Sequence, residues 1–233
     1  MNRISMNKSA IILFTLFSSL VFGRADLTIN QKIVGHERPH RITTWLHDDK
    51  MRTELRDDAY SVIIDLKTWD SITLMTGQKK FAKHTGAEIR QQNEFLKNAA
   101  GPLDKDMNNT PARPMATGKT EKVDGYETEI YTWSGARGLI QTLWVAKEYP
   151  NYTAIKAELA KIDRYNIAGP HKNSQPELSL LPGMVIKTEN NLNGQKGTIM
   201  LVSANVEPVD ASVFEVPAGY SAWQSPMGNK QLK

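Results

Sequence analysis

Residues 40–66, HRITTWLHDDKMRTELRDDAYSVIIDL, contain three short strand patterns separated by two polar turns. Over Ile42–Leu46 the side chains alternate with the two-residue period of a β-strand. His47–Lys50 and Asp57-Asp58 form the turns, because an aspartate side chain hydrogen-bonds the nearby backbone. Strands this close together pair as antiparallel neighbours. The stretch therefore predicts an antiparallel meander.

The meander pattern continues toward both ends of the chain, interrupted by two helical patterns. We expect helices at Glu88–Asn98 and at 151–166, and a long loop at Gly101–Lys119. Asp124-Gly125 and Asn193-Gly194 are typical two-residue hairpin turns. The expected strands are Leu27–Val34, Ile42–Leu46, Met51–Arg56, Tyr60–Leu66, Ser71–Met75, Lys80–Lys83, a strand from Thr120, Tyr126–Trp133, Leu139–Ala146, Met184–Glu189 and Thr198–Glu207.

Several strands are apolar on both sides. In one of them, Val62 and Ile64 lie on one face and Ile63 on the other. A sheet with one buried face needs a single apolar row, so helices, a further layer of the sheet or a hydrophobic ligand must cover the second. The element order favours an α+β, mainly β fold, with helices packed against an antiparallel sheet.

The first 25 residues have the three parts of a secretory signal. Arg3 and Lys8 precede an apolar run over 10–22, and Gly23-Arg24-Ala25 places small residues at the expected cleavage site. The run is shorter than the roughly 20 residues that cross a bilayer. We therefore expect cleavage after Ala25, with a cut after Gly23 as the alternative. The expected product is a periplasmic or secreted protein without a stable membrane anchor, with one domain over 26–220 and a flexible tail at 221–233. An uncleaved N-terminal anchor is the less favoured hypothesis.

The 233 residues include 29 basic and 25 acidic side chains, a formal charge of +4 that suggests an anionic partner. Removal of Arg3, Lys8 and Arg24 with the signal leaves 26 basic against 25 acidic residues. This near-neutral balance argues against nucleic-acid binding. The chain has no cysteine, which excludes disulfides, thiol nucleophiles and cysteine-ligated metals.

Eight segments carry a resemblance to a known family. They are Leu27–Lys32, Asp48–Glu54, Ile64–Leu66, Ile72–Met75, Gly125–Thr128, Leu143–Ala146, Leu181–Met184 and Phe214–Tyr220. In order and spacing they resemble the exported bacterial family named domain of unknown function 4412. That resemblance implies an architecture similar to the periplasmic lipoprotein carriers and receptors of the LolA and LolB type. These have a curved antiparallel sheet, an incomplete barrel, with helices on its concave side. The resemblance to this family implies no catalytic residue in the present sequence.

No motif with established chemistry is present. His36 and His40 are four residues apart, but Pro39 disfavours the helix that would place both on one metal ion, so we expect a polar loop. Asp48-Asp49 and Asp57-Asp58 fit turns better than paired acid–base catalysis, because adjacent strand residues point to opposite faces. The sequence predicts no metal, no cofactor and no catalytic residue.

Aromatic and methionine side chains on the expected strands are the candidate ligand-binding residues. Methionine is adaptable enough to line a ligand cavity, but aromatic strand residues usually pack internally, so a plain core is the favoured interpretation over a cavity. The set is Trp45, Tyr131, Trp133, Trp144, Met184 and Met200.

The first hypothesis is an exported, non-enzymatic carrier that holds a lipid, a lipoprotein or another hydrophobic ligand between sheet and helices. The alternative is a structural or interaction module of the cell envelope with a packed core and no ligand. A hydrolase with an unfamiliar site is a third hypothesis, which no motif supports. The sequence leaves the ligand and the oligomeric state open.

Overall fold

The computed structural model describes residues 26–35, 40–55, 60–100, 113–135, 139–168 and 175–223. The expected signal at 1–25, together with His36, Asp57-Asp58 and most of the expected 101–119 loop, lies outside them. None of the helices in the described ranges is long and apolar enough to cross a membrane.

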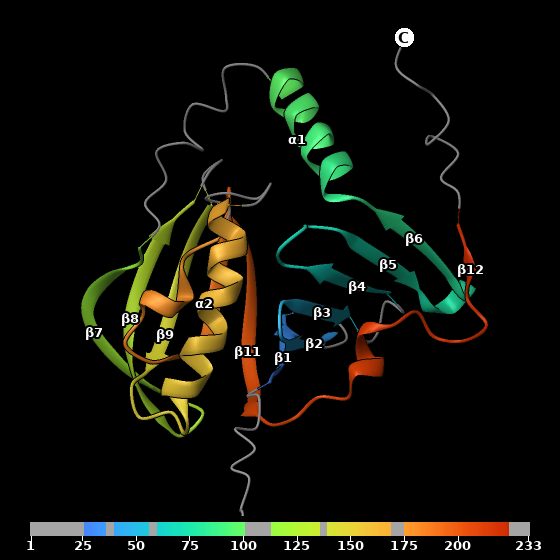
Figure 1. The fold of residues 1–233 in the computed structure, drawn as a ribbon. Coiled ribbons are helices and arrows are strands. Elements are labelled where there is room, and N and C mark those ends of the chain that lie inside the picture. Colours follow the sequence, from blue (N-terminus) through green and yellow to red (C-terminus); the bar gives the residue numbers. More distant parts are fainter. Residues whose placement is uncertain are drawn as a thin grey trace, which may run out of the picture.

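One open, curved sheet of 12 strands contains every described strand (Figure 1). Its spatial order is β12-β6-β5-β4-β3-β2-β1-β11-β10-β9-β8-β7, and all pairs are antiparallel except β12 with β6. The predicted order of six strands, a helix, three strands, a helix and two strands is confirmed. The elements are β1 (Leu27–Val34), β2 (His40–His47), β3 (Lys50–Leu55), β4 (Tyr60–Asp65), β5 (Ser71–Met75), β6 (Lys80–His84), α1 (Gly86–Ala100), β7 (Met115–Val123), β8 (Tyr126–Ser134), β9 (Leu139–Ala146), α2 (Tyr152–Ala168), β10 (Met184–Leu192), β11 (Gln195–Val206) and β12 (Ser221–Ala222).

Local turn chemistry sets two of the hairpins. Asp124-Gly125 connects β7 to β8, and Asn193-Gly194 connects β10 to β11. Both residues of each turn have a positive φ, which is 49° at Asp124, 87° at Gly125, 51° at Asn193 and 89° at Gly194. These angles suit a type I′ turn, whose twist matches that of the paired strands. Both predicted hairpins are confirmed.

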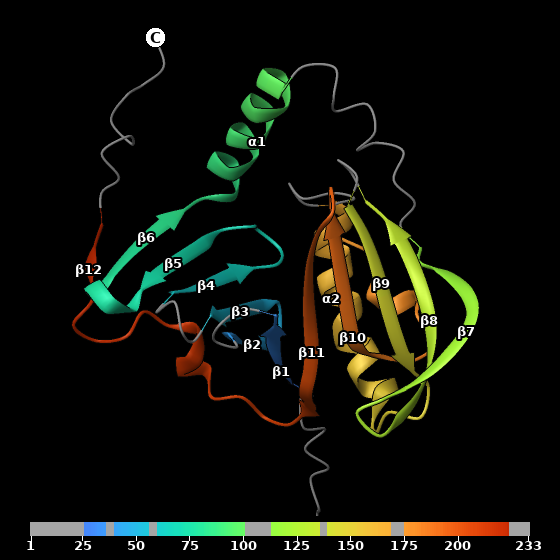
Figure 2. The same ribbon diagram turned by 180° about the vertical axis from the view of Figure 1, so that it is seen from behind.

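The main core lies between the sheet and α2. Ile155 and Leu159 of α2 belong to one buried cluster with Leu27 of β1, Leu46 of β2 and Leu201 of β11. In Figure 2 the strands β8–β11 stand in front of α2, so the helix covers one side of the sheet. We call this side the α2 face.

The opposite face is covered over β2–β6 by the segment that follows β11. Phe214, at the end of the short helix Ala211–Phe214, is buried against Ile63 of β4 and Leu74 of β5. The chain then forms β12, which pairs in parallel with Lys80 and Phe81 of β6. One apolar side of β4 therefore packs toward the core beneath α2, and the other packs against the segment that follows β11.

The structure corrects or extends three expectations. Met115–Lys119, expected in a loop, belongs to β7, which has an irregular register between Ala116 and Thr120. Ser221 and Ala222, expected at the start of a flexible tail, form β12. In Figures 1 and 2, α1 extends away from the end of β6, and the buried clusters include none of its described side chains. Two helices on the concave face are therefore not confirmed.

Candidate functional site

Trp45 lies on the opposite face, away from α2. It packs in the cluster around Phe214, and the Arg52 guanidinium carbon is 5.6 Å from its ring centroid. Arg52 also donates a hydrogen bond of 2.8 Å to the carbonyl oxygen of Val213. Trp45 therefore helps to hold the segment that follows β11.

Trp144 and Met200 are separated by one strand. Each is the cross-strand partner of Lys187, so all three share a face. The Lys187 ammonium is 3.9 Å from the Trp144 ring centroid, and the indole nitrogen donates a 2.7 Å hydrogen bond to Glu121. Trp144 is thus a buried, fully contacted core residue.

Tyr131 and Trp133 share a face, as their spacing predicts. Tyr131 packs against the buried cluster of Leu143 and Val145, and its hydroxyl donates to Glu129 at 3.1 Å. Trp133 is only 1% exposed. Both side chains pack internally.

Met184 lines the cavity between the sheet and α2, beside Ile29 and Leu159. The volume of this cavity is about 70 Å³. Pockets for small ligands are usually several hundred Å³. This cavity is therefore smaller than a usual ligand pocket, and the six predicted residues do not share one pocket, because Trp45 lies on the opposite face.

A different surface on the α2 face is only partly covered. Tyr60, Val62, Ile64 and Leu66 alternate along β4 and its end, and we call them the β4 row. Ile64 packs against the core beneath α2, which places the row on the α2 face. Its exposure falls from 39% at Tyr60, through the half-buried Val62 and Ile64, to 9% at Leu66.

Half-buried side chains flank the β4 row on both neighbouring strands. Leu55 and Met75 are the partners of Tyr60, and Thr53 and Thr73 are the partners of Val62. The hydroxyl groups of Thr53 and Thr44 form a hydrogen bond of 3.3 Å. We call this surface the β3–β5 strip; it comprises Met51, Thr53, Leu55, Tyr60, Val62, Ile64, Thr73 and Met75.

The β4 row ends at a groove of about 280 Å³ between α2 and two turns of the sheet. We call it the α2-end groove. It is lined by Asp49, Leu66, Lys67, Trp69, Lys161, Arg164 and Tyr165.

Trp69 has an unusual backbone conformation in this groove. Its φ is 68°, a left-handed value that is rare for a bulky residue and costs about 1–3 kcal/mol. The Asp65 carboxylate fixes the turn by accepting hydrogen bonds from the backbone N–H groups of Lys67 and Thr68. The Trp69 ring meets Tyr165 edge-on at 6.4 Å and lies 5.0 Å from the Arg90 guanidinium carbon. The sheet, α1 and α2 thus meet at one aromatic side chain.

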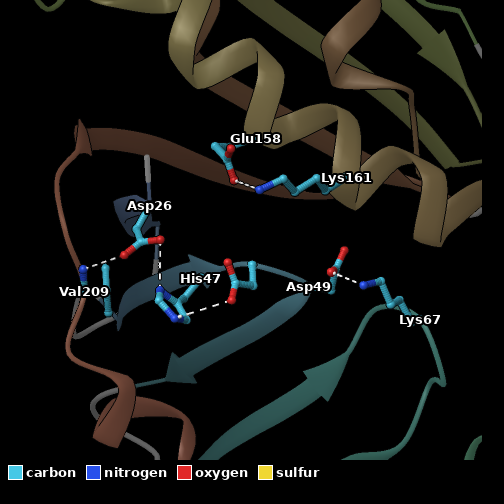
Figure 3. A network of polar contacts seen from close by, with 8 residues as sticks. Asp26, His47, Asp49, Lys67, Glu158, Lys161 and Val209 are labelled. Carbon is cyan, nitrogen blue, oxygen red and sulfur yellow. Dashed lines mark hydrogen bonds and ion pairs between the residues drawn. The ribbon is translucent and has the colours of Figure 1, made fainter. Parts of the chain in front are cut away.

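Two lysines of the groove are paired with carboxylates (Figure 3). Lys67 lies 2.7 Å from Asp49, and Lys161 lies 2.6 Å from Glu158. The Lys67 hydrogen bond holds the pKa of Asp49 below its usual value, outweighing the smaller effect of burial. Burial raises the pKa of Tyr165, so its hydroxyl stays neutral.

Charges of both signs surround the groove. Arg164 lines it, and Arg90 stacks on Trp69 beside it. The hydrogen bond with Asp49 raises the pKa of Lys67, and the nearby charges of Asp65 and Asp48 add to this effect. The groove is therefore a polar site in which neither sign of charge is in clear excess.

Neither Trp69 nor Tyr165 was among the predicted ligand-binding residues. Their contact joins residues 96 positions apart in different elements, which no local period reveals. A tryptophan directly after the polar Lys67-Thr68 turn was the available signal, because such a turn position usually holds glycine or asparagine.

Within the described ranges, no group of three His, Asp or Glu side chains could hold a metal ion. His47 lies 2.9 Å from the buried Asp26, whose other oxygen accepts from the Val209 N–H (Figure 3). His47 also stacks on Phe214 at 5.8 Å. This pair therefore anchors the segment after β11.

A family model described as "Domain of unknown function (DUF4412)" matches residues 27–220. A comparison with curated protein sequences finds no match. An uncharacterized conserved protein from Thermus thermophilus has a similar structure, with a TM-score of 0.50 at 6% identity over 86% of this chain and 90% of the other. This likeness shows a shared fold alone.

Two other solved structures are less similar. PNGF-II gives a TM-score of 0.41 at 11% identity over 85% of this chain, which spans only 30% of the PNGF-II chain. A putative outer membrane lipoprotein-sorting protein domain from Vibrio parahaemolyticus gives 0.32 at 11% identity, over 83% of this chain and 90% of the other.

Proposed function

The chain belongs to the DUF4412 family, and we propose that it is an exported, non-enzymatic binding protein for a lipid or another hydrophobic ligand. The proposed ligand lies along the more exposed end of the β3–β5 strip, around Leu55, Tyr60 and Val62, and not in the cavity beneath α2. The single observation that supports this site is the half-buried strip itself, whose side chains are apolar or threonine.

The strip has the composition of a surface that a ligand completes. Burying apolar surface is favourable by about 25 cal/mol per Å². Threonine contributes a methyl group, and the Thr44–Thr53 contact already gives one hydroxyl a partner. A hydrophobic ligand on the strip therefore gains burial without leaving that polar group unsatisfied.

The opposite side of the same strands offers no such surface. Ile63 and Leu74 are buried under Phe214. Ile63 is 4% exposed, whereas its neighbour Val62 is half-buried. The contrast along one strand supports the α2 face as the ligand-binding side.

The alternative is an envelope module with a packed core and no ligand. The cavity of about 70 Å³ beneath α2 supports it, because a filled interior needs no ligand. The two functions differ in whether the strip stays exposed to water.

Native mass spectrometry and a fluorescent hexadecanoate analogue test the proposal on protein expressed from the complete 233-residue sequence. Val62→Glu places a charge on the strip, where it would be buried against the ligand. We expect about a tenfold loss of affinity, equivalent to about 1.4 kcal/mol. Val202→Glu, at a 60% exposed position of β11, is the matched control and leaves the affinity unchanged.

A protein that carries no lipid and does not change the fluorescence of the probe would favour the packed module. Equal effects of Val62→Glu and Val202→Glu would remove the strip as the binding surface.

A further inference from the structure

We infer that the ligand is a single unbranched alkyl chain that lies across the strands, and that Trp223, at the outer edge of the sheet, forms one end of its binding surface. The inference rests on the proposed function and deepens it. It adds the chemical class of the ligand, its direction on the sheet and a binding residue outside the β3–β5 strip.

The core beneath α2 excludes a path along β4. Ile64 packs against that core and Leu66 is 9% exposed, so the β4 row is covered at this end. At the other end Tyr60 is 39% exposed and Val62 is half-buried. These two residues span only about 7 Å of the strand, at about 3.3 Å per residue. A longer ligand must therefore cross to the neighbouring strands.

One row of cross-strand partners runs from β3 to β6 through Val62. Val62 is the partner of Thr53 on β3 and of Thr73 on β5. Thr73 is in turn the partner of Ala82 on β6. Cross-strand partners point to the same side of a sheet, so these four residues share the α2 face. We call them the Val62 row.

The strand β12 adds Trp223 to the end of the Val62 row. Ala222 is the parallel partner of Phe81, and the Trp223 N–H donates a 2.7 Å hydrogen bond to the Phe81 carbonyl oxygen. The next register position therefore sets Trp223 beside Ala82, on the α2 face. Figure 2 shows β12 at the outer edge of the sheet, next to β6. From β3 to β12 the row crosses about 19 Å, at about 4.8 Å per strand.

The Val62 row forms the floor of a shallow lane. Its side chains are short, and Ala82, the shortest, is only 7% exposed. Longer side chains flank the row, two positions away along the strands; they are Leu55, Tyr60, Met75, Met51 and Ile64. A floor one residue wide between taller walls fits one alkyl chain and not a fused ring system.

Charge closes the neighbouring path across the strands. Met75, in the same cross-strand row as Tyr60, has Lys80 of β6 as its next partner. An alkyl chain gains nothing beside an ammonium group, which retains its water. The favourable path to the sheet edge therefore passes over Ala82 to Trp223.

Exposed aromatic side chains lie at both limits of the lane. Tyr60 flanks it on β4 at 39% exposure, and Trp223 ends it at 38% exposure. Single exposed apolar residues are normal on a protein surface, whereas several on one continuous apolar surface indicate a binding site. A tryptophan ring also buries a large area against an alkyl chain. Trp223 therefore contributes contact area that the strip alone lacks.

Displacement of the fluorescent analogue by hexadecanoate tests the role of Trp223 on protein expressed from the complete sequence. We expect Trp223→Ala to weaken binding about fivefold, because the ring no longer covers the chain. Leu192→Ala, at a 44% exposed position of β10, is the matched control and leaves the affinity unchanged.

A bromine label separates contact with the ligand from a purely structural role of Trp223. Bromine quenches indole fluorescence on contact, and hexadecanoate can carry it at the terminal methyl carbon or beside the carboxylate. We expect one labelled acid to quench more than the other, because only one end of the chain reaches Trp223. Trp223→Phe keeps an aromatic ring at the position and should remove this difference.

A sterol tests the chemical class of the ligand. Cholesteryl hemisuccinate carries a carboxylate, as hexadecanoate does, but its apolar part is a fused ring system. We expect hexadecanoate to bind about tenfold more tightly. Equal or tighter binding of the sterol would overturn the single alkyl chain.

The outcomes for the inference and for the proposed function are distinguishable. If Val62→Glu weakens binding while Trp223→Ala does not, the path to β12 is overturned and the proposed function remains. Equal quenching by the two labelled acids, unchanged in Trp223→Phe, would also overturn the contact at Trp223. Failure of hexadecanoate and the analogue to bind at all would overturn the proposed function itself.

Discussion

The left-handed backbone at Trp69 predicts an inverted order of stability for two substitutions. Trp69→Ala and Trp69→Gly both remove the indole ring and its contacts with Tyr165 and Arg90. The two variants differ only at the Cβ atom. Any difference between them therefore measures the backbone conformation.

The magnitude follows from the φ of 68°. At ordinary positions glycine is less stable than alanine by about 0.5–1 kcal/mol, because it loses more backbone freedom on folding. In the left-handed region a Cβ atom approaches the following carbonyl oxygen, which costs about 1–2 kcal/mol. We expect Trp69→Gly to be more stable than Trp69→Ala by about 1 kcal/mol.

Urea denaturation followed by circular dichroism measures both free energies of unfolding. The same pair of substitutions at Lys156, exposed within α2, is the control, and there alanine is more stable by about 1 kcal/mol. Trp69→Ala at least as stable as Trp69→Gly would refute the argument from strain.

Three further predictions concern other parts of the fold. Phe214→Ala should lower the free energy of unfolding by about 3–5 kcal/mol, because Phe214 is buried beneath the sheet, whereas Trp223→Ala, at 38% exposure, should cost less than about 1 kcal/mol in the same urea titration. Gly183→Ala should lower the thermal midpoint, because its Cβ would lie 2.2 Å from the Ala146 carbonyl oxygen; an unchanged midpoint would show that the chain relaxes there at little cost. Hydrogen bonds from the N-cap residue of α1 hold the pKa of Glu88 below its ordinary value, so its contribution to stability is complete above that ordinary pKa and is lost as the pH falls through the lowered one. The protection of amides in the first turn of α1, measured relative to their intrinsic exchange rate at each pH, should therefore fall on acidification, and Glu88→Gln should remove this fall.

The strand and helix order could be predicted because it depends on local patterns. Two-residue alternation marked the meander around Thr44, and Asp124-Gly125 and Asn193-Gly194 marked two turns. The strand at Met115–Lys119 was missed because Pro114 precedes it, Gly118 lies within it, and every side chain after Met115 is polar or small. An edge strand of this kind has no apolar alternation to detect.

The covers of the two faces could not be predicted. The double apolar rows of β4 correctly required two covers, but the pattern does not say which segment provides each. Phe214 reaches Ile63 across 151 positions of sequence. The surroundings of the candidate aromatic residues could not be predicted either. Trp45 and Trp144 pack in two different clusters. Alternation indicates which side chains share a strand face, not whether that face is filled.

The position of β1 has a consequence for the order of folding. β1 lies at the centre of the sheet, between β2 and β11, and the Asn30–Ser203 hydrogen bond joins residues 173 positions apart. The meander β1–β6 forms from near neighbours, whereas the β1–β11 ladder must close a loop of most of the chain, at an entropic cost that grows with loop length. Until β11 arrives, β1 is an unpaired edge, so the full sheet is reached only late in folding.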